Sequence, residues 1–398
     1  MNNVCAGGLT FALIALFCLG NTLRAAESDS SSNSTRVPLE YQETSYSVIN
    51  WGINLTGRST PFKKEPAAVT GKIIRGVLNF GPKSGEAVPF LWQRDARKLY
   101  LDLNRNEDLT DDPTGVFSAG EGPVNYATFT NAHLVFNTVA GKSRVLADIN
   151  FWDFGATANC NFSVRSFWQG KLTLEGHDWQ AGIIENGTDE SSPFVSSQLL
   201  LRPWAKRSQP FSAYNGSLAS VPFSPKLFFD GRAWGLTCAA HSQNGEARPT
   251  LQFTEQTVPL GELKITGQFI RRLVLTGAPY LVILDQPGSV VKIPTGKYHL
   301  GDVDLEGKGS TAFHNSLQSQ GGRQLSVSDK PAAAIDVGGP LTNSVAASRH
   351  GRDLRLDYSL IGAGGETYQM ANQDRSKPPT FAVYKNGKKL TSGTFEFG

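Results

Sequence analysis

The chain has 398 residues with 38 Lys or Arg and 35 Asp or Glu, so its formal charge is only +3. Acids and bases are interspersed, which excludes the clustered positive charge by which nucleic-acid-binding proteins are recognised. The length is too great for one ordinary core, and 23 Phe, 10 Tyr and 7 Trp can fill several small ones. We therefore expect several domains and no nucleic-acid partner.

The N-terminus has the pattern of a signal peptide. An apolar run from Leu9 to Gly20 precedes small residues at Ala25 and Ala26. We predict a signal peptide over residues 1–26 and a secreted, extracellular or periplasmic protein. The apolar stretch from Val4 to Leu23 approaches spanning length, so an uncleaved anchor stays open as the alternative. No other membrane contact is expected, and residues 27–48 are predicted to be a flexible linker.

The rest of the chain follows a period of two, broken by Gly, Asn and Pro. Apolar and polar residues alternate in Lys98–Asp102, Lys171–Leu174, Leu263–Thr266 and Leu354–Tyr358. This pattern predicts an all-β protein, made of several small antiparallel β-sandwich modules in tandem after the signal peptide. The predicted modules span residues 49–165, 166–258, 259–330 and 331–398, the last of which is expected to be immunoglobulin-like.

Three segments have the features of tight hairpins. Gln169–Trp179 and Pro225–Trp234 share the order strand, turn, aromatic-bearing strand, and are predicted to be equivalent hairpins. Lys385–Lys388 contains Asn-Gly, which readily adopts the positive φ values of a type I′ turn.

Residues 102–112 have oxygen-bearing side chains at alternate positions, an arrangement that can place several hard oxygen ligands around one calcium ion. The predicted metal ligands are Asp102, Asn104, Asn106, Asp108, Thr110 and Asp112. Asp108 would contribute its carbonyl oxygen, and either Asp111 or Asp112 would complete the shell. The alternative is a turn whose side chains cap their own backbone. Glu185–Glu190 is considered as a second, degenerate version, with an ordinary acidic turn preferred.

The segment Asp102–Leu109 resembles the calcium loops of EF-hands, dockerins and thrombospondin-type repeats. It departs from them at position six, where Glu107 replaces the usual Gly, and at position twelve, where Pro113 replaces the usual acid. The resemblance implies weak calcium binding with a stabilising role.

Two further resemblances concern the modules. Val290–Leu300, with Pro294, Gly296 and Tyr298 at its turn, resembles the closing hairpin of transthyretin-like modules, including the carboxypeptidase regulatory type. This resemblance covers residues 261–300 and implies a small β-sandwich. The arrangement as a whole resembles secreted bacterial proteins of uncharacterised function that join β-modules with D-x-N-x-N-x-D-L loops.

Four Cys residues are present, of which Cys5 and Cys18 lie in the predicted signal peptide. Cys160 and Cys238 would then remain, and in an oxidising compartment they can form a disulfide. The alternative is two buried free thiols in separate strands.

Motifs that would indicate an enzyme are missing from the sequence: no paired-His metal motif and no nucleophile elbow occur. We expect a non-enzymatic binding or scaffolding protein whose partner is an extracellular protein or a polysaccharide. Carbohydrate binding or polysaccharide degradation is the alternative, because several acids lie near aromatic residues in the sequence. These acids are Asp95, Asp148, Asp153 and Asp178, and the aromatic residues are Trp92, Trp152, Phe154 and Trp179. Core Trp residues with acids at the rim would give the same pattern.

Overall fold

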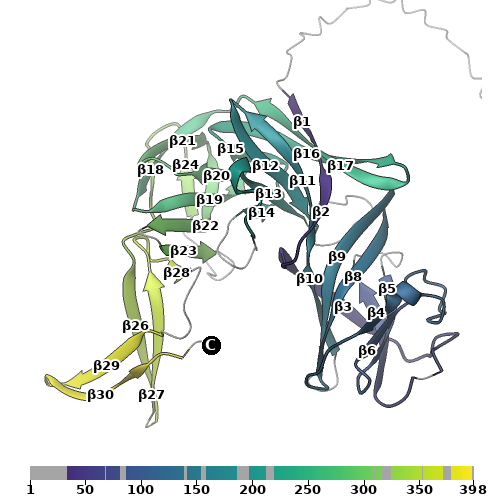
Figure 1. Cartoon of the computed structure of the whole chain (residues 1–398). Helices are drawn as coiled ribbons and strands as arrows, with labels where there is room; N and C mark the ends of the chain where they lie inside the picture. Colours follow the sequence, from purple (N-terminus) through teal and green to yellow (C-terminus); the bar gives the residue numbers. More distant parts are fainter. Residues whose placement is uncertain are drawn as a thin grey trace, which may run out of the picture. The chain divides into compact units, whose positions relative to one another are not determined.

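The computed structural model describes residues 34–67, 69–80, 87–138, 141–153, 158–185, 197–211, 219–307, 310–315, 324–351, 353–370 and 378–396. Every regular element in this part is a strand, apart from two short 3-10 turns, η2 (Pro113–Gly115) and η3 (Trp204–Lys206) (Figure 1). The all-β prediction is confirmed. The predicted signal peptide and most of the Glu185–Glu190 segment lie outside the described residues.

The first body of the structure is one antiparallel series of strands. Their order by hydrogen bonding is β8–β9–β10–β3–β4–β5–β6–β7. The strands are β3 (Ile49–Gly57), β4 (Ile73–Asn79), β5 (Ala87–Gln93), β6 (Lys98–Leu101), β7 (Val116–Ser118), β8 (Tyr126–Thr138), β9 (Gly141–Asp153) and β10 (Ala158–Val164).

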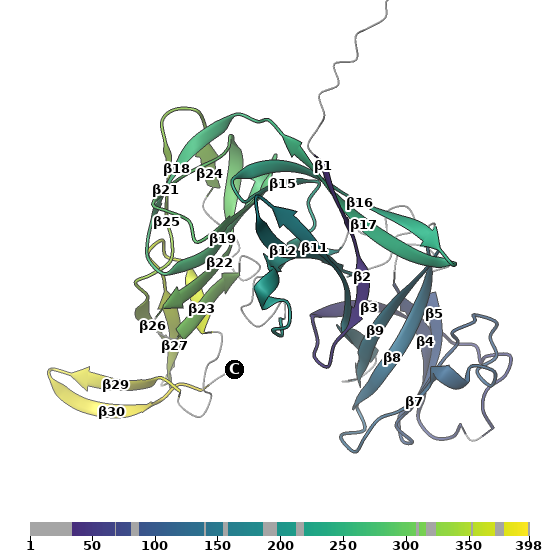
Figure 2. The ribbon, with the colours of Figure 1, turned by 45° about the horizontal axis from the view of Figure 1, so that its top comes forward.

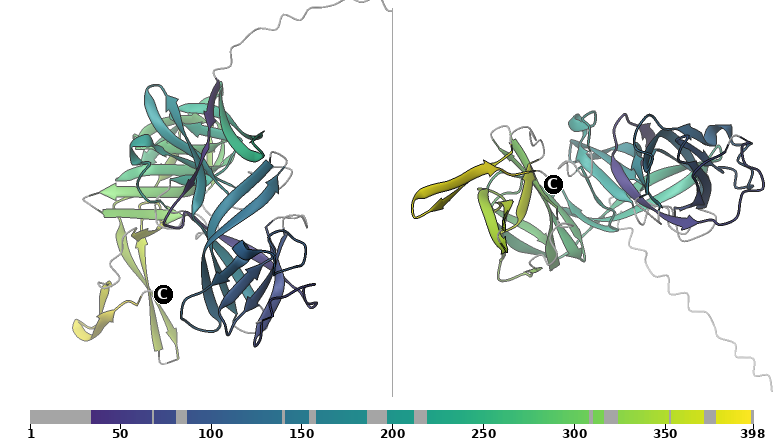
Figure 3. Two further views of the ribbon diagram at one scale, coloured as in Figure 1. Left: turned by 45° about the vertical axis from the view of Figure 1, so that its right-hand side comes forward. Right: turned by 90° about the horizontal axis from the view of Figure 1, so that it is seen from below.

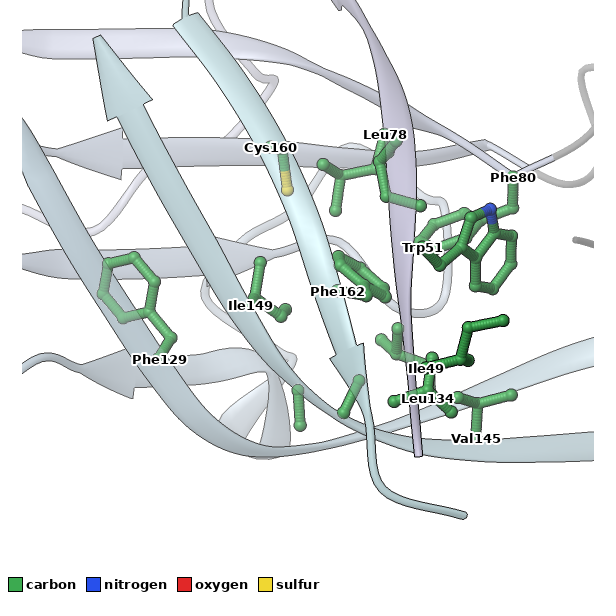
Figure 4. Close-up of a cluster of buried hydrophobic side chains, with 14 of the residues drawn as sticks. Ile49, Trp51, Leu78, Phe80, Phe129, Leu134, Val145, Ile149, Cys160 and Phe162 are labelled. Atoms are coloured by element: carbon green, nitrogen blue, oxygen red, sulfur yellow. The ribbon is translucent and has the colours of Figure 1, made fainter. Parts of the chain in front are cut away.

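This series folds back on itself around an aromatic core. The rings of Phe90 on β5 and Phe151 on β9 are 5.0 Å apart, although the two strands are not neighbours in the hydrogen-bonded order. Trp51, Phe80 and Phe162 gather in the same core, and Figure 4 shows them side by side. Burial of this apolar face holds together the strands on either side of the Asp102 loop.

The second body is built of layers around a central sheet. One outer sheet has the order β2–β11–β12–β13–β14. Its strands are β2 (Glu40–Glu43), β11 (Ser166–Leu174), β12 (His177–Ile184), β13 (Gln198–Pro203) and β14 (Ser220–Pro222). The central sheet has the order β1–β17–β16–β15–β20–β19–β22. Its strands are β1 (Ser34–Pro38), β15 (Lys226–Phe229), β16 (Arg232–Gln243), β17 (Glu246–Gln256), β19 (Ile270–Ala278), β20 (Leu281–Asp285) and β22 (Gly296–Gly307).

A third sheet covers the other face of the central sheet. Its order is β21–β18–β25, with β18 (Leu260–Thr266), β21 (Val290–Pro294) and β25 (Ala333–Asp336). Strand β20 is therefore buried on both faces. Leu281 and Ile283 lie in the second core, between the central sheet and the outer sheet. Val282 and Leu284 lie in the third core, between the central sheet and the third sheet. An uninterrupted apolar run is what such a doubly covered strand requires.

Among the described residues, four hairpins have two-residue turns in which both central residues have positive φ, the signature of a type I′ turn. The turn residues are Glu175-Gly176, Asp230-Gly231, Asn244-Gly245 and Asn386-Gly387. The two hairpins predicted to be equivalent, β11–β12 and β15–β16, are confirmed as such. They face each other in the second core, where the rings of Trp179 and Phe229 are 4.5 Å apart.

The segment with the transthyretin-like turn forms a corner between sheets. Strand β21 pairs with β18, whereas β22 pairs with β19, with β24 (Gln324–Val327) and with β23 (Ser310–Asn315). The expected hairpin between Val290 and Leu300 is therefore wrong. The buried Tyr298 hydroxyl donates to the Pro294 carbonyl oxygen at 2.9 Å and fixes the corner instead.

The C-terminal segment differs from the predicted immunoglobulin-like module. Strands β26 (Thr342–His350) and β27 (Asp353–Ile361) form a two-stranded ribbon, and β28 (Thr367–Met370) connects it to β23. Strands β29 (Thr380–Lys385) and β30 (Lys388–Thr394) form a separate hairpin, drawn in yellow in Figure 3. Between 342 and 396, Tyr368 is the one described residue that is buried, so the described part of this segment has no sandwich core.

Hydrogen-bonded strands cross the predicted boundaries between modules. The parallel pair β15–β20 crosses the boundary at 258/259, and the pairs β18–β25 and β23–β28 cross that at 330/331. The predicted linker 27–48 contains strands β1 and β2, and Val37 and Val48 are buried at 1% and 0% exposure. Figure 2 shows β1 lying beside β17.

Candidate cation-binding loop at Asp102

The loop of residues 102–112 starts where β6 ends and finishes at η2. Leu101 and Asp102 are 1% and 0% exposed, so the loop leaves directly from the interior. Leu109 is buried in a small cluster with Phe62, Leu91 and Tyr100. The loop is thus held by its first residue and by one apolar side chain near its end.

Asp102 organises the first half of the loop. Its Oδ1 accepts the backbone N–H of Asn106 at 3.1 Å, and its Oδ2 accepts that of Glu107 at 3.0 Å. Hydrogen bonds to an ionised acceptor are stronger than neutral ones, and these two bonds offset part of the desolvation of the carboxylate. Asp102 would keep this structural role with or without a cation.

The backbone turns sharply at positions four and six. Arg105 has φ of 62° and Glu107 has φ of 68°, both in the left-handed region. The Gly expected at position six is therefore replaced by a Glu that adopts the same conformation, at a cost of roughly 1–2 kcal/mol. Ion pairs of Glu107 with Arg58, at 3.0 Å, and with Lys63, at 3.5 Å, hold its side chain against the preceding loop.

Three side chains of the loop accept the backbone N–H two residues ahead. Asn104 Oδ1 accepts from Asn106 at 3.0 Å, Asn106 Oδ1 from Asp108 at 2.7 Å, and Asp108 Oδ1 from Thr110 at 3.0 Å. These are Asx turns, the self-capped arrangement that the sequence left open as the alternative. The Thr110 hydroxyl also donates to Asp108 Oδ1, at 2.5 Å.

Asp111 is the acid that accepts hydrogen bonds from the amide side chains of Asn104 and Asn106. Asn104 Nδ2 donates to its Oδ1 at 3.1 Å, and Asn106 Nδ2 donates to its Oδ2 at 2.7 Å. Asp112 faces inward instead: it is 7% exposed, and its Oδ2 accepts the N–H of Leu103 at 3.1 Å. Of the two acids considered from sequence, the structure favours Asp111 over the predicted Asp112 as the partner of positions three and five.

The carboxylates of Asp102, Asp111 and Asp112 lie close enough together to repel one another. Burial raises the pKa of Asp112, and the neighbouring carboxylates of Asp102 and Asp111 raise it further. Asp108 lies apart from them: its Oδ2 pairs with Lys64 Nζ at 2.6 Å, and chiefly this contact lowers its pKa to about 2. The predicted role of Asp108 through its carbonyl oxygen requires nothing of its side chain.

The donor set suits calcium in chemistry, because carboxylate and amide oxygens are the hard ligands that the ion prefers. The side chains are not arranged as a coordination shell, however. No group of three or more His, Cys, Asp or Glu placed to hold a metal ion is found within the described ranges. Asp111 instead accepts hydrogen bonds from the amide nitrogens of Asn104 and Asn106.

Of the two alternatives for the cysteines, the structure has free thiols and no disulfide between Cys160 and Cys238. Cys160 and Cys238 are free thiols in this structure and belong to different cores. Cys160 lies on β10 in the first core, among the side chains drawn in Figure 4. Cys238 lies on β16 beside the second core. A disulfide needs its two Cα atoms within about 7 Å, and each thiol is instead held by the packing of its own strand.

Each of the acids expected near aromatic residues has a partner of its own. Asp148 pairs with Arg165 at 3.0 Å and Asp153 with Arg94 at 2.6 Å, and the two lie on opposite faces of β9. Asp178 pairs with Lys171 at 2.7 Å, and Asp95 accepts the Lys72 N–H at 3.0 Å. Trp92 and Trp179 are core residues at 0% and 8% exposure, as the alternative interpretation expected, Trp152 is half-buried, and Phe154 lies outside the described residues.

Sequence reasoning missed several buried ionisable groups, Glu185 and Arg202 among them. Glu185 is 7% exposed at the end of β12, and Arg202 is 5% exposed on β13. The sequence contains a pattern that could have indicated each buried charge. Glu185 follows the apolar pair Ile183-Ile184, and Arg202 follows Leu199-Leu200-Leu201. A charge that interrupts an apolar run in a buried strand is a candidate for a buried charge.

Comparisons with protein-family models, with curated proteins and with solved structures find no match for this chain. Across the described residues, the structure contains no helix with the length and apolar character needed to span a membrane.

Proposed function

We propose that this chain is a secreted, non-enzymatic binding or scaffolding protein whose Asp102 loop binds calcium. Secretion is supported by the leader pattern of residues 1–26. The calcium ligands would be Asp102, Asn104, Asn106, the carbonyl oxygen of Asp108, Thr110 and Asp111, with the ion stabilising the first body.

The observation that carries this proposal is the position of Asp111. Its two oxygens are bonded to the amides of Asn104 and Asn106, and its charge acts on Asp112 together with that of Asp102. A divalent cation would replace the amide N–H groups as the partner of Asp111 and would relieve the repulsion among three nearby carboxylates. Without an acid at position twelve, weak binding is expected, in the range of about 10⁻⁴–10⁻³ M found for extracellular modules.

The test is thermal unfolding in millimolar calcium and in chelator. At a calcium concentration about tenfold above Kd, we expect stabilisation of roughly 1.4 kcal/mol, and thus a higher melting temperature. Asp111→Asn should remove this increase, because it keeps the shape of the side chain and deletes its charge.

Asp108→Asn is the matched control in the same loop. It weakens the pair with Lys64 but leaves the backbone carbonyl, so the calcium response should persist. Identical melting curves with calcium and with chelator for the unmutated protein would contradict the proposal.

A further inference from the structure

A cavity of about 280 Å³ lies where the outer sheet β2–β11–β12–β13–β14 meets strands β19, β20 and β22. It is lined by the cations Arg202, Lys206, Arg271 and Arg272 and by the acids Asp285 and Asp304. The two sides are joined directly, since Arg272 donates to the Leu201 carbonyl oxygen at 2.9 Å. The volume is close to the lower end of that of known small-molecule sites.

Two of the four cations are neutralised within the cavity wall. Arg272 makes a bidentate pair with Asp285, with bonds of 2.6 and 2.9 Å, and Arg271 pairs with Asp304. Among the described residues, neither Arg202 nor Lys206 forms an ion pair with a carboxylate. The lining therefore carries an excess of two positive charges.

Arg202 is the buried cation of the cavity that lacks a carboxylate partner among the described residues. Its guanidinium, on a residue 5% exposed, donates to three neutral acceptors: Gln180 Oε1 at 2.6 Å, Gln209 O at 3.0 Å and Arg207 O at 2.8 Å. Burial lowers its pKa. Because the desolvation of a buried ion is unfavourable, an anion in the cavity would stabilise this cation. A guanidinium has five N–H donors, so Arg202 retains capacity for such a ligand.

Trp179, which also lines the cavity, supplies a second free donor. The residue is 8% exposed, and its Nε1–H is buried without an acceptor in the described structure. Leaving a buried donor unsatisfied is unfavourable, and a ligand oxygen that accepts from it would remove that cost.

We propose that this cavity binds the oxyanion group of a small, monosaccharide-sized ligand. Arg202 and Lys206 provide the charge and Trp179 Nε1–H a directed donor, while the pairs with Asp285 and Asp304 hold Arg272 and Arg271 in place. A neighbouring cavity of about 500 Å³ shares Lys206, Arg271 and Gln286 with the first, and it has room for the rest of the ligand. This inference does not depend on the calcium loop.

The experiment is calorimetric titration of the full chain, in the presence of chelator, with glucuronate, inorganic phosphate and glucose. A carboxylate on a sugar, a free anion and a neutral sugar are thereby compared. We expect glucuronate to bind and glucose not to bind. If glucuronate binds more tightly than phosphate, the site is assigned to a sugar acid. If phosphate binds as tightly as glucuronate or more tightly, the site is assigned to an inorganic oxyanion.

Lys206→Ala tests the site without disturbing the core, because Lys206 is exposed on η3. It should weaken binding about tenfold, the effect of losing one charge-assisted hydrogen bond. Lys264→Ala, an exposed lysine on β18 that does not line the cavity, is the matched control and should change nothing. Absence of binding for both anions, or equal binding to Lys206→Ala and the unmutated protein, would overturn the proposal.

Discussion

The indole Nε1–H of Trp168 donates to Oε1 of Glu185 at 3.1 Å, inside the protein. The Ser143 hydroxyl donates to the same oxygen at 2.9 Å. These two neutral donors do not compensate for desolvation, so that burial raises the pKa of Glu185 from 4.5 to about 7. Glu185 is therefore the group through which stability should depend on pH near neutrality.

We predict that Glu185→Gln stabilises the protein at pH 8. A raised folded-state pKa means that the folded protein binds a proton more tightly than the unfolded chain does. The contribution of Glu185 to the free energy of unfolding is then fully present below pH 4.5 and declines as the pH rises towards 7. The total decline is about 3 kcal/mol, from 1.4 kcal/mol per pKa unit. The measurement is urea unfolding between pH 4 and 8, where Glu185→Gln should flatten this part of the profile.

The matched control for this experiment is Glu262→Gln, which changes an exposed acid on β18. Its pH profile should follow that of the unmutated protein. If the free energy of unfolding of Glu185→Gln declines as steeply between pH 4.5 and 7 as that of the unmutated protein, Glu185 is not the group whose titration causes the decline.

The Asp102 carboxylate should contribute to stability even when calcium is chelated. Asp102→Ala removes both acceptors for the N–H groups of Asn106 and Glu107, each worth about 1.5–3 kcal/mol as a bond to a charged group. We expect the free energy of unfolding to fall by about 3 kcal/mol in chelator. Asp111→Ala, at an exposed position, should have a much smaller effect there. Comparable losses in the two variants would argue against this role of Asp102.

Both described cysteines should react slowly with thiol reagents in the native state. Burial raises the pKa of Cys160 and of Cys238, and the charge of Glu185 adds to the effect at Cys238. Since the thiolate is the reactive form, labelling at pH 8 should be far slower in buffer than in denaturant. The number of thiols labelled after denaturation should be the same with and without reductant. A reductant-dependent increase would indicate that a disulfide forms in the protein.

The C-terminal hairpin should contribute little to stability. No described residue between 378 and 396 is buried, so deletion of residues 378–398 should change the free energy of unfolding by less than about 1 kcal/mol. Tyr368→Ala offers the contrast, because that ring is 3% exposed in the third core and its removal should cost about 3–5 kcal/mol. Equal losses from the two changes, measured by denaturant unfolding, would show that the hairpin packs more than its exposure indicates.

Features set by neighbouring residues could be predicted from the sequence. The turns at Gly176, Gly231 and Gly387 depend on two residues that take positive φ, and the surrounding alternation of apolar and polar side chains specifies the strands. The sequence also located the Asp102 loop, and its Asx turns were the alternative to a calcium site there; both depend on contacts over two to five residues.

Features set by distant contacts could not be predicted. The parallel pairing of Leu227–Phe229 with Leu281–Ile283 joins two predicted modules, and no local pattern specifies the partner of a strand. In the loop, Asp111 and Asp112 are identical in chemistry, and the one-residue difference that turns Asp112 inward is set by its bond to Leu103. The solvation of Glu185 and Arg202 likewise depends on which sheets cover them.

Strand β1 pairs with β17 in the register Ser34↔Thr254, although these segments lie far apart in the chain. During synthesis, the ribosome must therefore deliver the segment around Thr254 before β1 can reach its place. Val37 and Leu39 remain accessible to water and to chaperones for that interval. The order in which the segments of this protein are translated consequently exposes its early strands to aggregation before the native layers can close.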